Sequence, residues 1–199
     1  MPKHIQCQCQ QVINLFDGLF AASHNTRLVC ALCDGRHGEL DQPVYEPAQA
    51  HKASHQIVFA HGYFASALHE ISHWCLAGEE RRLLEDFGYW YRPDGRNSQQ
   101  QKAFEKVEIK PQALEWLFSL ASRQVFVASA DNLTAEASND LAFRLAVSSQ
   151  ARAYLDHGLP PQASLWLDQL KQVYGGQVLC EQLYWPEEDN AQLERPKTP

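Results

Sequence analysis

The sequence predicts an α+β domain in which a small mixed sheet packs with helices and a metal-binding helix is buried at the centre. Two short apolar runs, 28–32 and 56–60, have the length of buried strands. Several longer segments carry apolar residues at helical spacing, and few strands among many helices favour the α+β class. A His-Glu-x-x-His pattern at residues 69–73 lies in one of these helical segments.

The N-terminal half predicts both strands of the sheet and the central helix. Its expected elements are a helix over 11–20, a strand over 28–32, a Gly- and Pro-rich loop over 34–47, a strand over 56–60 and a helix over 61–77. Gly78 ends the last of these helices, because glycine readily adopts the left-handed conformation that follows a helix.

The C-terminal half is mainly helical. We expect a charged segment over 79–87, an aromatic loop over 88–95, a helix from Asn97 or Ser98 to about 109, helices over 111–122, 135–155 and 161–174, and a strand over 125–128. Pro111 suits the first turn of a new helix. Residues 1–185 are therefore expected to form a single catalytic domain, and the polar residues 186–199 a flexible tail.

Charge and apolar patterning limit the classes of partner. The chain has 199 residues and a net charge of −7, with no basic run longer than two residues, so direct nucleic-acid binding is disfavoured. The apolar runs are too short to cross a membrane, and the N-terminus lacks the apolar core of a signal peptide. We therefore expect no membrane contact and a cytoplasmic location.

Six cysteines leave two interpretations open. Cys7 and Cys9 form one pair and Cys30 and Cys33 another, which is compatible with a structural zinc site. However, the first pair is too closely spaced for the usual zinc knuckle. Reduced and mostly buried thiols are the favoured interpretation.

The His69-Glu-Ile-Ser-His73 segment is the strongest chemical signal. Residues four apart on a helix lie one turn above each other, so both imidazoles can reach one metal ion. Glu70 lies between them, where a carboxylate can take a proton from a metal-bound water. The segment therefore predicts metal ligands at His69 and His73 and a catalytic role for Glu70.

The composition of this helix favours a buried site. Between His55 and Gly78 the sequence has no Lys, Arg or Asp, and Glu70 is the only acidic residue. An apolar stripe runs along one side, and the histidines lie opposite it among small residues. These residues are Gly62, Ala65, Ser66 and Ala77, with Leu76 at the end. A buried carboxylate without a compensating charge is costly, so a cation near Glu70 is expected.

A third ligand is expected from the helix that follows Ser98. If Ala103, Phe104 and Val107 form its inward face, Glu108 lies about 90° from the centre of that face and Glu105 about 150°. Glu108 is therefore the predicted ligand, and Glu105 remains the alternative. Two histidines and one carboxylate suit either zinc with a hydrolytic water or ferrous iron that binds dioxygen.

Three segments of the sequence closely resemble the bacterial elongation factor P hydroxylase family. They are His69–Gly78, the run Asp-Phe-Gly-Tyr-Trp-Tyr-Arg-Pro-Asp-Gly-Arg over 86–96, and the run Val-Glu-Ile-Lys-Pro-Gln-Ala-Leu-Glu-Trp over 107–116. The likeness covers about residues 8–185. It implies a non-haem iron monooxygenase that uses dioxygen to hydroxylate the β-lysylated lysine of elongation factor P. The family's metal ligands map onto His69 and His73, and its carboxylate onto Glu108.

The resemblance also implies where the substrate lies. The cationic arm of the modified lysine is expected beside Gly62, Ala65 and Ser66, with Tyr89, Trp90 and Tyr91 either along its path or packed in the core.

Two alternative functions remain open. One is a zinc-dependent HExxH peptidase or amidase in which Glu70 is the general base. The other is a metal-stabilised adaptor without catalytic activity.

Overall fold

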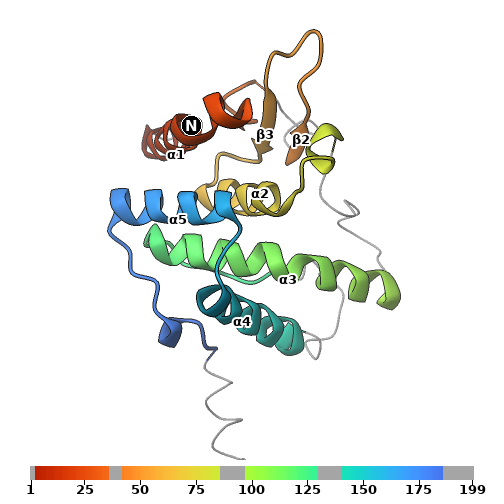
Figure 1. The fold of residues 1–199 in the computed structure, drawn as a ribbon, viewed down its shortest axis with the longest axis vertical. Helices are drawn as coiled ribbons and strands as arrows, with labels where there is room; N and C mark the ends of the chain where they lie inside the picture. Colours follow the sequence, from red (N-terminus) through yellow and green to blue (C-terminus); the bar gives the residue numbers. More distant parts are fainter. Residues whose placement is uncertain (1–2, 36–41, 86–96, 130–139, 186–199) are drawn as a thin grey trace, which may run out of the picture.

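The computed structural model describes residues 3–35, 42–85, 97–129 and 140–185 of the chain. Figure 1 shows a small sheet with helices packed beside and below it. The elements in order are α1 (Lys3–His24), β1 (Thr26–Cys30), β2 (Val44–Glu46), β3 (His55–Phe59), α2 (Phe64–Leu76), the 3-10 helix η2 (Arg81–Leu83), α3 (Ser98–Ala121), α4 (Asp140–His157), α5 (Pro161–Tyr174) and the 3-10 helix η3 (Cys180–Gln182).

The sheet has three strands in the order β1-β3-β2. β1 runs parallel to β3, and β2 runs antiparallel to it. The sheet is therefore mixed, as predicted. Leu28, Ile57 and Phe59 belong to the main core, and Val58 and Val44 form a smaller apolar cluster with Ala31. Since neighbouring residues of a strand face opposite sides, β3 contributes to both clusters.

The helices surround the sheet unevenly. α1 packs against β1 and α2 against β3, while α3 contacts α2, α4 and α5. In Figure 1, α3 accordingly runs between α2 and α4. Phe16 and Phe20 of α1 form edge-to-face or tilted ring contacts with Trp74 of α2. α2 therefore has the sheet and α1 on one side and α3 on the other, which confirms the predicted central helix.

Three sequence predictions for local structure are wrong. The predicted loop over 34–47 contains β2, whose three residues pair only with β3. The two helices expected over 98–109 and 111–122 are one continuous helix, α3, with Pro111 inside it. Every residue from 111 to 119 is buried, so packing from the proline onward outweighs the missing N–H donor. Residues 125–128 form no strand, and Val125 and Val127 are largely exposed.

Other elements match the predictions closely. α5 begins at Pro161 and ends before Gly175, which adopts the left-handed conformation. Asn97 caps α3 by accepting a hydrogen bond from the backbone N–H of Gln100. The helix expected over 11–20 extends to Lys3–His24. The aromatic loop with Tyr89, Trp90 and Tyr91 and the predicted tail lie outside the described residues.

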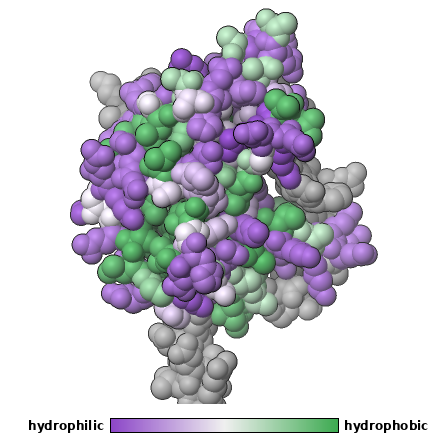
Figure 2. Space-filling model, viewed as in Figure 1, coloured by the Kyte–Doolittle hydropathy of each residue, from purple (hydrophilic) through white to green (hydrophobic). Residues whose placement is uncertain are grey.

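A helix that spans a membrane must be long and predominantly apolar. Among the described residues, no helix is both long and apolar enough to cross a bilayer. Figure 2 shows hydrophobic and hydrophilic residues intermixed over the visible face. Single exposed apolar residues of this kind are ordinary on protein surfaces.

Candidate metal centre

A tight connection sets the position of α2 relative to the sheet. After β3, His61 and Gly62 adopt positive φ angles of 53° and 69°, a conformation that glycine adopts freely. The carbonyl of Gly62 accepts a hydrogen bond from the thiol of Cys9 at 2.8 Å. Ser66 Oγ accepts the backbone N–H of Ala60 at 3.1 Å. These contacts hold the first turn of α2 against both the end of β3 and α1.

One face of α2 packs in the core, and another face carries His69 and His73. Leu68, Ile71 and Cys75 are buried in the core, as the apolar stripe of the sequence predicts. His69 and His73 lie on the side that faces α3, and their side chains are 29% and 28% exposed. Both imidazoles therefore lie at the edge of the interior, next to α3, with some access from solvent.

α3 supplies two buried carboxylates to this edge. Glu108 is 3% exposed and Glu115 is 9% exposed. They are seven residues apart, which is close to two helical turns, so both face α2. Gln112, one turn from Glu108, donates to its Oε2 at 3.4 Å and to the carbonyl of Ser129 at 2.7 Å. Glu108 is thus held from its own helix.

The three predicted ligands converge on one point. His69 Nε2 and His73 Nε2 are 3.1 Å apart. Glu108 Oε1 lies 3.3 Å from His73 Nε2, and Glu108 Oε2 lies 3.6 Å from His69 Nε2. Ligand atoms about 2.1 Å from a metal and at right angles to one another would be about 3 Å apart. This donor set therefore fits a divalent transition metal and leaves coordination positions open.

Glu115 fixes the orientation of His69. Its Oε2 accepts a hydrogen bond from His69 Nδ1 at 2.8 Å. A carboxylate that accepts from Nδ1 keeps the proton of the neutral imidazole there and leaves the lone pair of Nε2 directed at the metal position. The structure thus contains the carboxylate–histidine pair that commonly supports a metal ligand.

The electrostatics of the site favour a bound cation. Burial alone would lower the pKa of His69, but the hydrogen bond with Glu115 and the charges of Glu115, Glu70 and Glu108 raise it to about 10. For Glu108, burial would raise the pKa, but its hydrogen bond with His73 and the charge of both imidazoles lower it to about 2. Burial raises the pKa of Glu70. A metal ion would compensate the same carboxylates.

The structure distinguishes between the two predicted carboxylates. Glu105 accepts a hydrogen bond from Gln101 on its own helix and does not join the cluster. Glu108 lies close to His69 and His73, as predicted. The predicted inward face of this helix is partly wrong, because Ala103 is exposed. Glu115 falls in the separate helix that the sequence predicts over 111–122, so the sequence provides no reason to align it with Glu108. The seven-residue spacing from Glu108 is informative only if the helix continues through Pro111.

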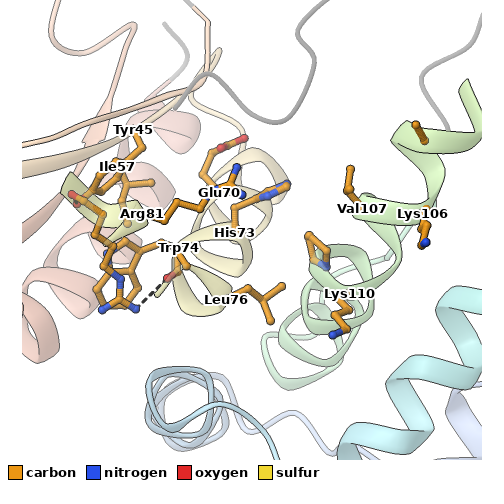
Figure 3. A pocket seen from close by; sticks show the side chains of 14 residues that line it. Tyr45, Ile57, Glu70, His73, Trp74, Leu76, Arg81, Lys106, Val107 and Lys110 are labelled. Atoms are coloured by element: carbon orange, nitrogen blue, oxygen red, sulfur yellow. Dashed lines mark hydrogen bonds between the residues drawn. The ribbon is translucent and has the colours of Figure 1, made fainter. Parts of the chain in front are cut away.

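A pocket of about 670 Å³ adjoins the candidate metal site (Figure 3). Glu70 and His73 form part of the pocket wall, so the pocket lies beside the face of α2 that carries the candidate ligands. Lys106, Val107 and Lys110 line it from α3. Its remaining lining residues are Tyr45, Ile57, Trp74, Leu76, Ala77, Arg81, Arg82, Ala103 and Pro111. The residues expected beside the substrate arm, Gly62, Ala65 and Ser66, are not among them.

The cysteines provide no second metal site among the described residues. His69, His73 and Glu108 are the one group of potential ligands that lie close enough together in the described parts of the chain. Cys9 and Cys30 are buried free thiols, and Cys33 is an exposed one. Burial raises the pKa of the Cys9 and Cys30 thiols. The side chain of Cys7 lies outside the described residues, so its part in a zinc site stays a prediction.

Comparisons with known proteins agree with the resemblance seen in the sequence. The family model for elongation factor P hydroxylase matches residues 15–184. The chain is also similar to the elongation factor P lysine hydroxylase of Haemophilus influenzae, with 47% identity over 154 residues. This match covers 77% of the chain and 82% of the relative. The range of the family model, residues 15–184, includes the sheet and the helices that carry the candidate metal centre. The chain therefore belongs to the elongation factor P hydroxylase family.

Proposed function

We propose that this protein is a non-haem iron monooxygenase that hydroxylates a lysine of elongation factor P after that lysine has received a β-lysyl group. The convergence of His69, His73 and Glu108 is the observation that supports metal-dependent chemistry. The name of the Haemophilus relative supports a lysine of elongation factor P as the target. The β-lysyl group and the iron are parts of the proposal that rest on the family resemblance.

The donor set is compatible with iron, and membership of a hydroxylase family favours iron over zinc. Two imidazoles and one carboxylate on one side of an ion leave positions for dioxygen and substrate. Ferrous iron bound there would supply the activation of dioxygen that oxygen insertion into a carbon–hydrogen bond requires. His69, His73 and Glu108 hold the ion, and Glu115 keeps His69 in the tautomer that can bind it.

Glu70 is the proposed catalytic proton carrier. It lines the pocket next to His73, and burial raises the pKa of its carboxyl group. A carboxyl group with a raised pKa takes up a proton more readily than an exposed one and can return it during the reaction. Glu70 does not belong to the group of three convergent ligands. A change in its protonation state would therefore not remove a ligand from the metal.

A zinc-dependent peptidase or amidase is the alternative function. The HExxH segment and the position of Glu70 beside His73 would serve a hydrolytic water equally well. Membership of a family of hydroxylases argues for the oxygenase. We further propose that the enzyme acts in the cytoplasm on the translation factor itself, with no direct contact to nucleic acid or membrane.

The proposal is tested by mass analysis of the partner. The protein is loaded with ferrous iron without air, mixed with β-lysylated elongation factor P and an excess of ascorbate as electron donor, exposed to air and analysed by intact mass. We expect a gain of one oxygen atom, which should be absent without air and absent with His73→Ala. No mass gain from folded, iron-loaded protein would exclude the hydroxylase, and cleavage of an amide with zinc bound would then support the alternative.

A further inference from the structure

Basic side chains predominate among the charged residues that line the pocket beside the candidate metal centre. Arg81, Arg82, Lys106 and Lys110 all line it, and among its described lining residues Glu70 is the one acidic side chain. The whole chain has a net charge of −7, so the pocket has the opposite sign to the protein as a whole. Charges of one sign gathered along a concave wall raise the local concentration of ligands with the opposite sign.

Two elements contribute these cations from opposite sides. Lys106 and Lys110 are one turn apart on α3, and Arg81 and Arg82 lie in η2 after α2 (Figure 3). Like charges that face a shared space repel one another unless an anion lies between them. The arrangement therefore favours a small anionic ligand within the pocket.

Arg82 is held in place and keeps one buried donor unused. Its guanidinium carbon lies 4.4 Å from the ring centre of Trp74, and one terminal nitrogen donates to the carbonyl of Trp74 at 3.0 Å. Tyr45 donates its hydroxyl to the carbonyl of Arg82 at 3.0 Å. Among the described residues, Arg82 Nε and Trp74 Nε1 are buried and have no hydrogen-bond partner. The Trp74 ring and the two backbone contacts therefore fix the position of Arg82 at the pocket wall.

The cations also argue against the lysine arm as the occupant. On the proposed function, on which this inference rests, the substrate side chain carries ammonium groups. A cationic arm in this pocket would meet four like charges on the lining residues. The volume of about 670 Å³ lies in the range of small-molecule sites. The pocket is therefore better suited to a second, anionic small molecule than to the lysine arm.

We propose that this pocket is a binding subsite for the carboxylate of a small organic acid that acts beside the metal centre. Insertion of one oxygen atom from dioxygen into a carbon–hydrogen bond requires a two-electron reductant for the other atom. A 2-oxo acid can serve, since its oxidative decarboxylation releases carbon dioxide and takes up that atom in the new carboxylate. Arg and Lys side chains are the usual partners of carboxylates. The carboxylate lies between α3 and η2, and its remaining atoms extend toward Glu70 and His73.

The test measures binding rather than turnover. Zinc-loaded protein, in which the metal cannot exchange electrons, is titrated calorimetrically with succinate, 2-oxoglutarate, inorganic phosphate and the neutral analogue succinamide. We expect saturable binding of succinate, of 2-oxoglutarate or of both, with an affinity that falls as the salt concentration is raised. Succinamide should not bind. The double variant Lys106→Ala/Lys110→Ala should weaken carboxylate binding at least about tenfold. Arg81→Ala should also weaken it.

Lys102→Ala is the matched control, because Lys102 is exposed on the same helix but does not line the pocket. It should change carboxylate affinity less than about twofold. The absence of carboxylate binding, tighter binding of phosphate, or equal effects of Lys102→Ala and the double variant would each overturn the subsite. Binding that none of the cation variants changes would indicate simple coordination to zinc and would overturn it as well.

The outcome separates this inference from the proposed function. If the protein binds succinate through Lys106 and Lys110 but never adds oxygen to elongation factor P, the subsite is supported and the hydroxylase function is contradicted. If the protein adds oxygen but binds no organic acid, the hydroxylase function is supported and the subsite is contradicted.

Discussion

Glu115 on α3 accepts a hydrogen bond from Nδ1 of His69 on α2 across 2.8 Å. This contact connects the two helices that carry the candidate metal ligands and orients the ring nitrogen that faces Glu108. We expect Glu115→Ala to weaken metal binding by about 10- to 100-fold, which is the usual effect of losing a carboxylate behind a ligating histidine. Titration of zinc against a competing chelator measures the change.

Glu115→Gln is the conservative comparison for this prediction. The amide oxygen can still accept the Nδ1 proton but carries no charge, so the loss of metal affinity should be smaller than with alanine. Unchanged metal affinity in a folded Glu115→Ala variant would mean that the hydrogen bond does not orient His69.

Glu108 and Glu105 allow a matched test of the third ligand. They lie on the same helix three residues apart, but Glu108 is 3% exposed and contacts both imidazoles, whereas Glu105 contacts Gln101. Glu108→Ala should weaken metal binding by about 100-fold or more, because it removes a direct ligand. Glu105→Ala should leave affinity within about twofold. Comparable losses from both variants would contradict the ligand assignment.

Metal binding should depend on pH through His69. Burial would lower the pKa of His69, but the hydrogen bond and charge of Glu115, with the charges of Glu70 and Glu108, raise it to about 10 in the metal-free protein. His69 therefore carries an extra proton at neutral pH, and the metal must displace it. Metal affinity should rise as pH rises, by up to about tenfold per pH unit between about pH 7 and pH 9.

Calorimetry in buffers with different ionisation enthalpies counts the protons that metal binding releases. Release of about one proton attributable to His69 is expected, and Glu115→Ala should reduce it because the largest raising influence on His69 is then removed. An affinity that stays constant over this pH range would show that His69 is already neutral before the metal binds.

The sequence predicts most of what depends on short-range patterns. α5 is predicted to the residue, because proline at its start and glycine after its end are local signals. The convergence of His69 and His73 follows from four-residue spacing on a helix. β2 has only three residues and exists through its pairing with β3, so no local pattern indicates it.

The continuity of α3 is the main feature that the sequence does not predict, and it also conceals part of the site. Proline in a helix interior normally ends or kinks the helix. Here Pro111 and the residues up to 119 are buried between neighbouring helices, and this packing keeps the helix intact. Glu115 therefore stays in phase with Glu108. Only the tertiary structure reveals this relation, because the local preference of proline points the other way.

Gly176 offers a stability test away from the metal centre. Its backbone N–H donates to the carbonyl of Ala121 at the end of α3 at 3.1 Å. A Cβ at this position would overlap the carbonyl oxygens of Leu120 and Ala121, which belong to backbone and cannot rotate away. We expect Gly176→Ala to lower the free energy of unfolding by about 1–3 kcal/mol. The melting temperature should fall by several degrees, as measured by circular dichroism.

Gly18→Ala is the opposite case within the same protein. Gly18 lies inside α1, and an added Cβ would meet nothing within 4 Å. Alanine should therefore stabilise the fold by about 0.5–1 kcal/mol, because it restricts the unfolded chain and favours helix. Neither variant touches a metal ligand, so zinc affinity should stay unchanged in both. A Gly176→Ala protein as stable as wild type would show that the segment after α5 can move away from α3 at little cost.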